Sequence, residues 1–276
     1  MSEPTSQPRL ANIRLHPIKA LDPVPVPEAR IGPNGGLELD RVWALFASDG
    51  KWVNGKRTPA VHLIRAEYNQ EISQVTLSVP GDSRKIKPTT FSFPADFVLA
   101  SKWFSDYFEQ PVIVRYIREG VPDDGLAPGP TIVSTASLQA ICDLFPGMTL
   151  SEARERFRTT LEIESVPAFW EDQLFGPEEN YAVRFKIGEV SFEGSNPCAR
   201  CPVPPRNPRT GEINFEFTRK FTQMRRSSIP AWTPEARFDH YYRLATNTRV
   251  PSSETGKLLR VGDSVLLYGG VSLPGG

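Results

Sequence analysis

The chain has 276 residues, of which 27 are proline and 20 are glycine, and this density of turn-forming residues disfavours long helices and helical bundles. Hydrophobic residues make up 39% and charged residues 23%, so the chain can bury a sizeable core, and its length suits about two domains. The 32 Lys and Arg residues balance the 32 Asp and Glu residues, so no global field attracts nucleic acid, and any anion site must be a local basic cluster.

Short apolar runs separated by turn residues predict strands in the first half of the chain, at residues 13–16, 41–47, 51–53, 61–68 and 75–79. Asp49-Gly50 predicts a two-residue hairpin turn between two of these runs, because such a turn needs residues that tolerate a positive φ.

Residues 96–108 predict the first helix, because apolar side chains repeat there at helical spacing. The polar segment 119–130, which contains three prolines and three glycines, follows this helix after a short interval. We expect the boundary between two domains in this segment, so that the first domain covers residues 1–120 and the second covers 121–276.

The second half opens with a predicted strand, residues 131–133, that runs into a helix beginning at Ser134 and Thr135. Backbone N–H groups at a helix start suit a phosphate, although Ser and Thr also cap ordinary helices. A second helix begins with a capping box at Thr149 and Glu152 and runs to about Phe157. Further strands are predicted at residues 161–163, 182–187, 189–193, 258–261 and 264–268.

Basic residues gather at the end of the second helix. Arg154 and Arg158 fall on one face at i,i+4 spacing, with Arg156 between them. This pattern indicates either part of an anion site or a solvated basic face.

The proline-rich segment 196–211 follows a predicted strand, and we expect no regular structure in it because proline lacks a backbone donor. It presents a Cys-x-x-Cys pair, Cys198 and Cys201, on a stiff loop. Arg200, Arg206 and Arg209 in the same loop favour the thiolate form of a nearby cysteine.

Three interpretations of the cysteine pair remain open. A redox pair of the thioredoxin type requires a helix after its first cysteine, which the prolines forbid. A structural zinc site requires four ligands, and the remaining cysteine and histidines are remote in sequence: Cys142, His16, His62 and His240. Two buried thiols that pack the loop are the third interpretation. Cys142 itself lies on the apolar face of its helix, so we expect it to pack in the core.

Several segments in the expected order resemble MOSC proteins, which take their name from the C-terminal domain of molybdenum cofactor sulfurase. HPIK at residues 16–19 and LELDRVW at 37–43 resemble the MOSC N-terminal β-barrel. Five later segments resemble the MOSC domain proper: FR at 157–158, FWED at 169–172, KIGEV at 186–190, NPRTG at 207–211 and VGD at 261–263. The likeness is to the amidoxime-reducing, molybdenum-containing branch.

The resemblance implies an α+β, β-rich fold in which an N-terminal β-barrel domain is followed by a MOSC β-barrel domain with a few helices. It also implies a mononuclear molybdenum cofactor (molybdopterin with Mo). In that branch the second cysteine of the pair binds the metal, so Cys201 is the candidate ligand and catalytic residue, and Cys198 is its neighbour. By position, the resemblance assigns five further residues to the pterin or its phosphate: Lys19, Arg41, Ser134, Thr135 and Arg158.

The implied activity is reduction of small N-hydroxylated or N-oxide substrates by oxygen-atom abstraction. Three cysteines cannot form a ferredoxin-like cluster, so we expect electrons from a separate donor protein. A cofactor carrier or sulfur-transfer protein with a persulfide on Cys201 is the alternative, and a structural or binding role is the third. We do not expect pyridoxal phosphate binding.

The chain departs from the family pattern at four places: Ala20, Thr160, Pro204-Pro205 and Asn207. Substrate choice is therefore the least transferable inference. No segment approaches the roughly 20 apolar residues that span a bilayer, and residues 1–10 lack the apolar core of a secretory signal. We expect a cytoplasmic protein without membrane or nucleic-acid partners.

Overall fold

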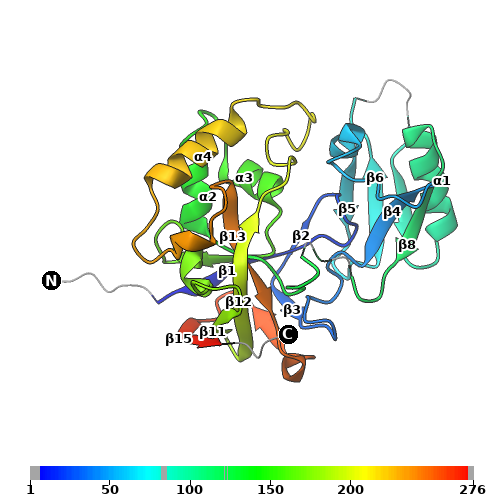
Figure 1. Cartoon of the computed structure of the whole chain (residues 1–276). Helices are drawn as coiled ribbons and strands as arrows, with labels where there is room; N and C mark the ends of the chain where they lie inside the picture. The colour runs from blue at the N-terminus through cyan, green and yellow to red at the C-terminus, as the bar shows by residue number, and fades with distance from the viewer. Residues whose placement is uncertain (1–6, 82–85, 121, 123, 273–276) are drawn as a thin grey trace.

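Two lobes, each with its own hydrophobic packing, make up the computed structural model, which describes residues 7–81, 86–120, 122 and 124–272 (Figure 1). The larger lobe is built on an eight-stranded sheet in the order β15 (Val265–Ser272), β11 (Tyr181–Ile187), β12 (Val190–Ala199), β13 (Arg243–Arg249), β9 (Ile132–Ser134), β10 (Leu161–Glu164), β1 (Arg9–Leu15) and β2 (Val24–Val26). Neighbouring strands are antiparallel except β9 and β10, which are parallel.

The large sheet closes into a barrel where the start of β1 meets the residues that lead into β15. Arg9 bridges Ser264, and the backbone N–H of Leu10 donates to the carbonyl of Asp263 at 2.8 Å. Closure removes the two open edges at this point. The β-rich α+β class with a barrel in the second half is confirmed.

Three helices cover one side of the barrel: α2 (Thr135–Cys142), α3 (Leu150–Phe157) and α4 (Phe217–Ser227) (Figure 1). They share a core that includes Leu138, Phe157 and Phe221. Thr149 caps α3 as expected, because its Oγ1 accepts from the N–H of Glu152 at 3.2 Å. Neither α4 nor β13 is predicted by the sequence pattern.

The smaller lobe contains two further sheets and the first helix. β4 (Trp43–Ala47) pairs with β8 (Val112–Tyr116), and a meander joins β5 (Arg65–Tyr68), β6 (Gln74–Ser78) and β7 (Thr89–Ser92). Helix α1 (Phe97–Phe108) packs on these strands and begins at Asp96, which confirms the predicted helix. β3 (Glu28–Arg30) pairs with β14 (Leu258–Arg260) apart from them.

Two local predictions in the smaller lobe need correction. The Asp49-Gly50 hairpin forms, but only Gly50 has a positive φ (+75°), and the N–H of Gly50 donates to the carbonyl of Ala47. The turn is therefore one residue longer than predicted, with a glycine bulge. The first half of the predicted strand 61–68 is a short 3-10 helix, Pro59–Leu63, because Pro59 starts a helical turn.

No single point in the sequence divides the residues of the two lobes. β1 and β2 lie in the barrel of the larger lobe, although they precede all the strands of the smaller lobe in sequence. Ile18 and Leu21, between these two strands, belong to the core of the smaller lobe. The segment near residue 120 is where the chain passes from β8 of the smaller lobe to β9 of the larger.

None of the helices in the described ranges combines the length and the apolar character needed to cross a membrane.

Candidate functional site

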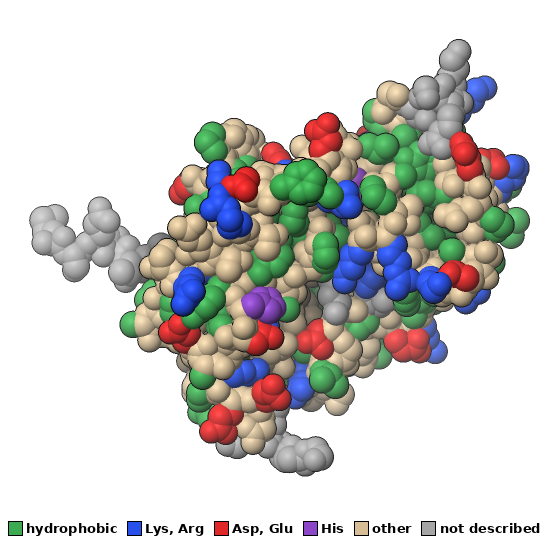
Figure 2. All heavy atoms as spheres, turned by 45° about the horizontal axis from the view of Figure 1, so that its top comes forward, with side chains coloured by type: hydrophobic (Ala, Val, Ile, Leu, Met, Phe, Trp, Pro, Cys, Tyr) green, Lys and Arg blue, Asp and Glu red, His purple; other side chains and the backbone are tan. Residues whose placement is uncertain are grey.

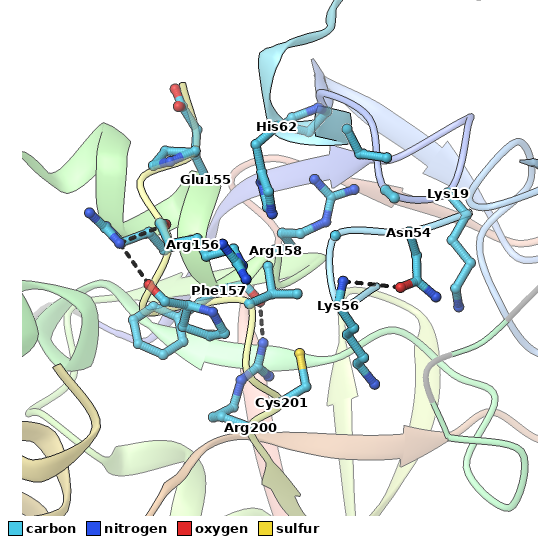
Figure 3. A pocket seen from close by; sticks show the side chains of 18 of the residues that line it. Lys19, Asn54, Lys56, His62, Glu155, Arg156, Phe157, Arg158, Arg200 and Cys201 are labelled. Atoms are coloured by element: carbon cyan, nitrogen blue, oxygen red, sulfur yellow. Dashed lines mark hydrogen bonds between the residues drawn. The ribbon is translucent and has the colours of Figure 1, made fainter. Parts of the chain in front are cut away.

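A cavity of about 470 Å³ lies where the two lobes meet. The smaller lobe and the chain leading to it contribute Lys19, Asn54, Lys56 and His62 to its wall, and the larger lobe contributes Phe157, Arg158, Arg200 and Cys201 (Figure 3). Arg158 ties the lobes together behind the cavity, because its Nη2 donates to the carbonyl of Leu21 at 2.7 Å.

The cavity wall is strongly basic in a chain of zero net charge. Its basic side chains are Lys19, Arg41, Lys56, Arg65, Arg156, Arg158, Arg200 and Arg206, against the acidic Asp22, Asp124 and Glu155. Lys and Arg side chains also gather near the junction of the lobes on the face shown in Figure 2. A local excess of positive charge in a recess attracts anions, as the neutral composition requires of any anion site here.

Four of the six predicted site residues line this cavity: Lys19, Arg41, Arg158 and Cys201. They come from both lobes and from four separate places in the sequence. Ser134 and Thr135 are not among the residues of its wall. The assignment of all six to a cofactor stays a prediction.

Cys201 follows the end of β12 and its sulfur is directed into the cavity (Figure 3). The neighbouring Cys198 is buried, and its sulfur accepts a hydrogen bond from Nη1 of Arg200 at 3.1 Å. Arg200 also donates to the carbonyl of Phe157 and lies 5.5 Å from the centre of that ring. The pair is therefore asymmetric, with one thiol held in the wall and the other half-buried and open to the cavity.

Regular structure extends further into the proline-rich segment than predicted. Residues 196–199 form the end of β12, and Pro197 is paired with Thr246 of β13. Register shifts on both sides of Pro197 accommodate the missing N–H, as bulges do. The strand therefore fixes the start of the loop that carries Cys201.

Three residues of the wall have a left-handed backbone although they are not glycine: Ala20 (φ 76°), Arg41 (φ 53°) and Arg158 (φ 52°). Such a conformation costs roughly 1 kcal/mol or more and persists only where the surroundings impose it. The N–H of Arg41 donates to the carbonyl of His16, and that of Arg158 closes the last turn of α3 on Arg154. The fold thus places the cationic side chains of Arg41 and Arg158 in the wall of the same cavity.

A buried network supports Arg41 from behind. Its guanidinium donates to Asp40 and also reaches the carbonyl of Arg158 at 3.2 Å. Burial alone would raise the pKa of Asp40, but Arg41 and the contact with His16 lower it, so this carboxylate stays charged. Burial and the nearby Arg158 lower the pKa of His16 to about 3, so the imidazole is neutral.

The start of α2 already has anionic partners inside the protein. The N–H of Ser134 and the Oγ of Ser137 both donate to Oε2 of Glu171, at 3.2 and 2.9 Å. Thr135 donates to Glu162 at 2.7 Å. The backbone and hydroxyl donors at this helix start, which would favour a phosphate, are therefore bonded to buried carboxyl groups. Cys142, at the other end of the helix, packs in the core as predicted.

Glu171 makes folding stability depend on pH. Burial, and then the neighbouring Asp172, raise its pKa to about 7. A carboxyl with a raised folded-state pKa stabilises the fold at low pH, and this contribution is lost as the pH rises through the folded-state pKa. Between pH 5.5 and pH 8 we expect a loss of about 2 kcal/mol from this group.

Glu171→Gln should remove this dependence, as measured by urea unfolding at both pH values. The difference between wild type and variant isolates Glu171, because groups such as the neutral His16 contribute equally to both. Glu164→Gln at an exposed position is the control. An unchanged pH dependence in Glu171→Gln would contradict the prediction.

Comparison with known proteins agrees with this architecture. Residues 7–111 match the family model of the MOSC N-terminal beta barrel domain. This part of the chain is therefore similar to MOSC N-terminal domains. The resemblance to MOSC proteins is thereby confirmed.

Curated proteins are similar to this chain at low identity. Mitochondrial amidoxime-reducing component 1 of Xenopus laevis is 23% identical over 297 residues, which cover 93% of this chain and 81% of that protein. Mitochondrial amidoxime reducing component 2 of Homo sapiens is 24% identical, covering 74% and 68%. Molybdenum cofactor sulfurase of Drosophila grimshawi is 24% identical, but this chain spans only 29% of its length.

The segment that matches the MOSC N-terminal model supplies cavity residues that the sequence pattern did not single out for the site. Asn54 begins a tight turn in which its Oδ1 accepts from the N–H of Lys56 at 3.0 Å. The Asn-Gly dipeptide at residues 54–55 is a turn signal that points to this loop. His62 lies beside it and was weighed only as a remote zinc ligand.

A group of amide side chains on the larger lobe was also missed. Asp124 accepts from the Nδ2 atoms of Asn196 and Asn247, at 3.3 and 3.0 Å. All three line the cavity, and the Oδ1 atoms of both asparagines are buried without a hydrogen-bond partner in the described part of the chain. Unsatisfied acceptors in a cavity wall favour a ligand with N–H donors.

Proposed function

We propose that this chain is a molybdenum-cofactor oxidoreductase that reduces small N-hydroxylated or N-oxide substrates by oxygen-atom abstraction. The observation that carries the proposal is the thiol of Cys201, directed into a basic cavity between the lobes (Figure 3). The similarity to amidoxime-reducing components supports the reaction class.

The cavity residues fit such a cofactor. About 470 Å³ is within the range of roughly 300–1,000 Å³ that small-molecule and cofactor sites occupy. A phosphate would be held by Lys19, Arg41 and Arg158, and a heterocycle with N–H donors by the amide group of Asn196 and Asn247. A thiolate suits a soft metal centre.

From the described residues, we propose one ligand for such a metal, the thiol of Cys201. No three His, Cys, Asp or Glu side chains in the described part of the chain come together as a metal site. A metal at Cys201 would therefore take its other ligands from the pterin dithiolene. When bound, the molybdenum cofactor would supply the two-electron chemistry that removes an oxygen atom and releases it as water.

In this scheme the protein's own residues would anchor and orient the cofactor. Arg200, next to Cys201, would hold this part of the loop in place, because its guanidinium joins the sulfur of Cys198 to the carbonyl of Phe157. Val203 and Pro204 form an apolar part of the wall beside the thiol and exclude water from it. We propose a separate electron-donor protein and a cytoplasmic location.

Loading the protein with molybdenum cofactor and assaying a benzamidoxime-type substrate with an artificial reductant tests the proposal. We expect about one molybdenum per chain and reduction to the amidine. A chain that holds the metal in this ratio but reduces neither amidoximes nor N-oxides would refute the function.

Sulfur transfer is the second candidate, and the open thiol of Cys201 together with the similarity to molybdenum cofactor sulfurases favours it. Here Cys201 would carry a persulfide instead of binding metal. Purified protein without metal but with one reducible sulfur on Cys201, found by mass spectrometry, would support transfer over reduction.

A further inference from the structure

His62 stands out among the cavity residues because nothing in the predicted function uses it. It lies in the short helix Pro59–Leu63 of the smaller lobe, and its ring is directed into the cavity (Figure 3). Its Nε2 atom is buried and has no hydrogen-bond partner among the residues that the structure describes. A buried polar nitrogen without a partner costs free energy unless a ligand satisfies it.

Two glycines lie close to this imidazole and leave space for it. A Cβ on Gly55 would lie 2.7 Å from Nε2 of His62, so that only glycine allows the ring its position. A Cβ on Gly211, in the loop of the larger lobe, would lie 3.7 Å from the Cβ of His62. The ring therefore lies in the cavity wall between residues of both lobes.

The charges that face His62 come from several elements. Arg65 follows it in the smaller lobe and pairs with Asp22 at 3.3 Å, while Arg158 at the end of α3 and Arg206 in the proline-rich loop face it from the larger lobe. Lys56 follows Gly55, and the carboxylates Asp124 and Glu155 lie elsewhere on the wall. Burial lowers the pKa of His62 to about 4, opposed by a backbone contact with Gly55 and assisted by these arginines, so the free protein holds a neutral imidazole.

We propose that His62 binds an oxyanion in the cavity and takes up one proton as it does so, so that its Nε2–H donates to the anion. The proton comes from solvent, no bond other than N–H forms, and no electron moves. The ligand class is a phosphate-like oxyanion, supplied either by the cofactor or by an anionic substrate.

The size of the effect follows from simple electrostatics. One negative charge about 4 Å from the imidazole, at the effective dielectric constant of a protein surface, raises its pKa by about three units. His62 would then titrate at about pH 7 or above with the anion bound, against about 4 without it. Near pH 6 binding therefore changes the ring from neutral to cationic.

Sulfate is the probe, because it remains a dianion throughout the range from pH 5.5 to pH 7.5. We expect its affinity, measured by calorimetry on the metal-free full chain, to be about tenfold higher at pH 5.5 than at pH 7.5. His62→Gln should lose this dependence, and the difference between the two proteins excludes titration of Asp22, Asp124 and Glu155. His240→Gln, at an exposed position outside the cavity wall, is the matched control and should behave as wild type.

NMR of the imidazole Cε1–H signals reports the protonation directly, because the chain has only three histidines. At pH 6 sulfate should convert the His62 signal to that of an imidazolium and leave the His16 and His240 signals in place. Gly55→Ala keeps the imidazole but displaces Nε2, so it should weaken the conversion. A His62 signal that stays neutral at saturating sulfate, or equal pH dependence in His62→Gln, would overturn the proposal.

Anion binding by His62 requires an oxyanion in the cavity but does not require the proposed reduction. Experiments can therefore refute either one without refuting the other. In the cofactor-loaded protein, an imidazolium signal without added sulfate assigns the oxyanion to the cofactor, and one that appears only with sulfate assigns it to a substrate. Loss of amidoxime reduction with an intact sulfate response would refute the enzyme and leave the role of His62.

Discussion

Cys201→Ala in the cofactor-loaded protein is expected to reduce amidoxime turnover more than about 100-fold, because loss of a direct metal ligand exceeds the roughly 10–100-fold cost of losing a supporting residue. The side chain is half-buried and its sulfur faces the cavity, so the fold should remain intact. Turnover with an artificial reductant and the thermal unfolding midpoint are the two measurements.

The control for this prediction is Cys142→Ala, which removes a thiol in the core of the larger lobe, away from the cavity. It should lower stability and retain turnover. X-ray absorption adds a direct test, since Cys201→Ala should remove one sulfur from the metal's inner sphere. Turnover equal to that of wild type in Cys201→Ala would eliminate the ligand assignment.

Arg158→Glu is expected to lower cofactor retention at least tenfold. Arg158 is half-buried, lines the cavity and donates to the carbonyl of Leu21 across the lobe junction. Loss of a charge-assisted hydrogen bond is worth about 1.5–3 kcal/mol, and the reversed charge adds repulsion toward an anionic ligand. Molybdenum and pterin per chain after gel filtration measure retention.

Arg209→Glu is the matched control, because Arg209 is exposed, pairs with Glu155 at 3.0 Å and lies outside the cavity wall. It reverses the same charge nearby and should keep the cofactor. Arg158→Lys preserves the charge and should lie between wild type and Arg158→Glu. Equal cofactor content in Arg158→Glu and Arg209→Glu would remove Arg158 from the site.

Local patterns predicted those elements whose buried faces are apolar. Helix α1 follows its apolar repeat, and Thr149 caps α3 as its capping box indicates. Helix α4 escaped prediction because its third inward position is Arg225, which is buried and pairs with Asp172 at 2.5 Å. An arginine at a core position interrupts the apolar repeat that marks a helix.

Strand β13 was missed for a related reason. Its buried side chains are mostly polar, and hydrogen bonds that sequence cannot show satisfy them. Thr246 donates to the carbonyl of Glu171 at 2.6 Å and Thr248 to that of Pro130 at 2.7 Å. Asn247, between them, reaches the cavity wall, so the amide part of the site was lost together with the strand.

The basic part of the site was accessible from sequence because its residues lie in recognisable motifs. Lys19, Arg41, Arg158 and Cys201 all line the cavity. The helix start at Ser134 was not separable from an ordinary cap, since the carboxylate that meets it, Glu171, lies far along the chain. Pairings of this kind depend on tertiary structure alone.

The closure of the barrel by its first strand has a consequence for biosynthesis. β1 can pair early with β2, which follows it closely in sequence, but its partners on the other side are β10 and the residues beside Ser264, which are made much later. Pairing across such sequence separations makes folding slow, because a long loop must close before any contact rewards it. The nascent chain therefore carries a β1–β2 pair whose other edge stays open until β10 has been made, and an open strand edge is prone to aggregation.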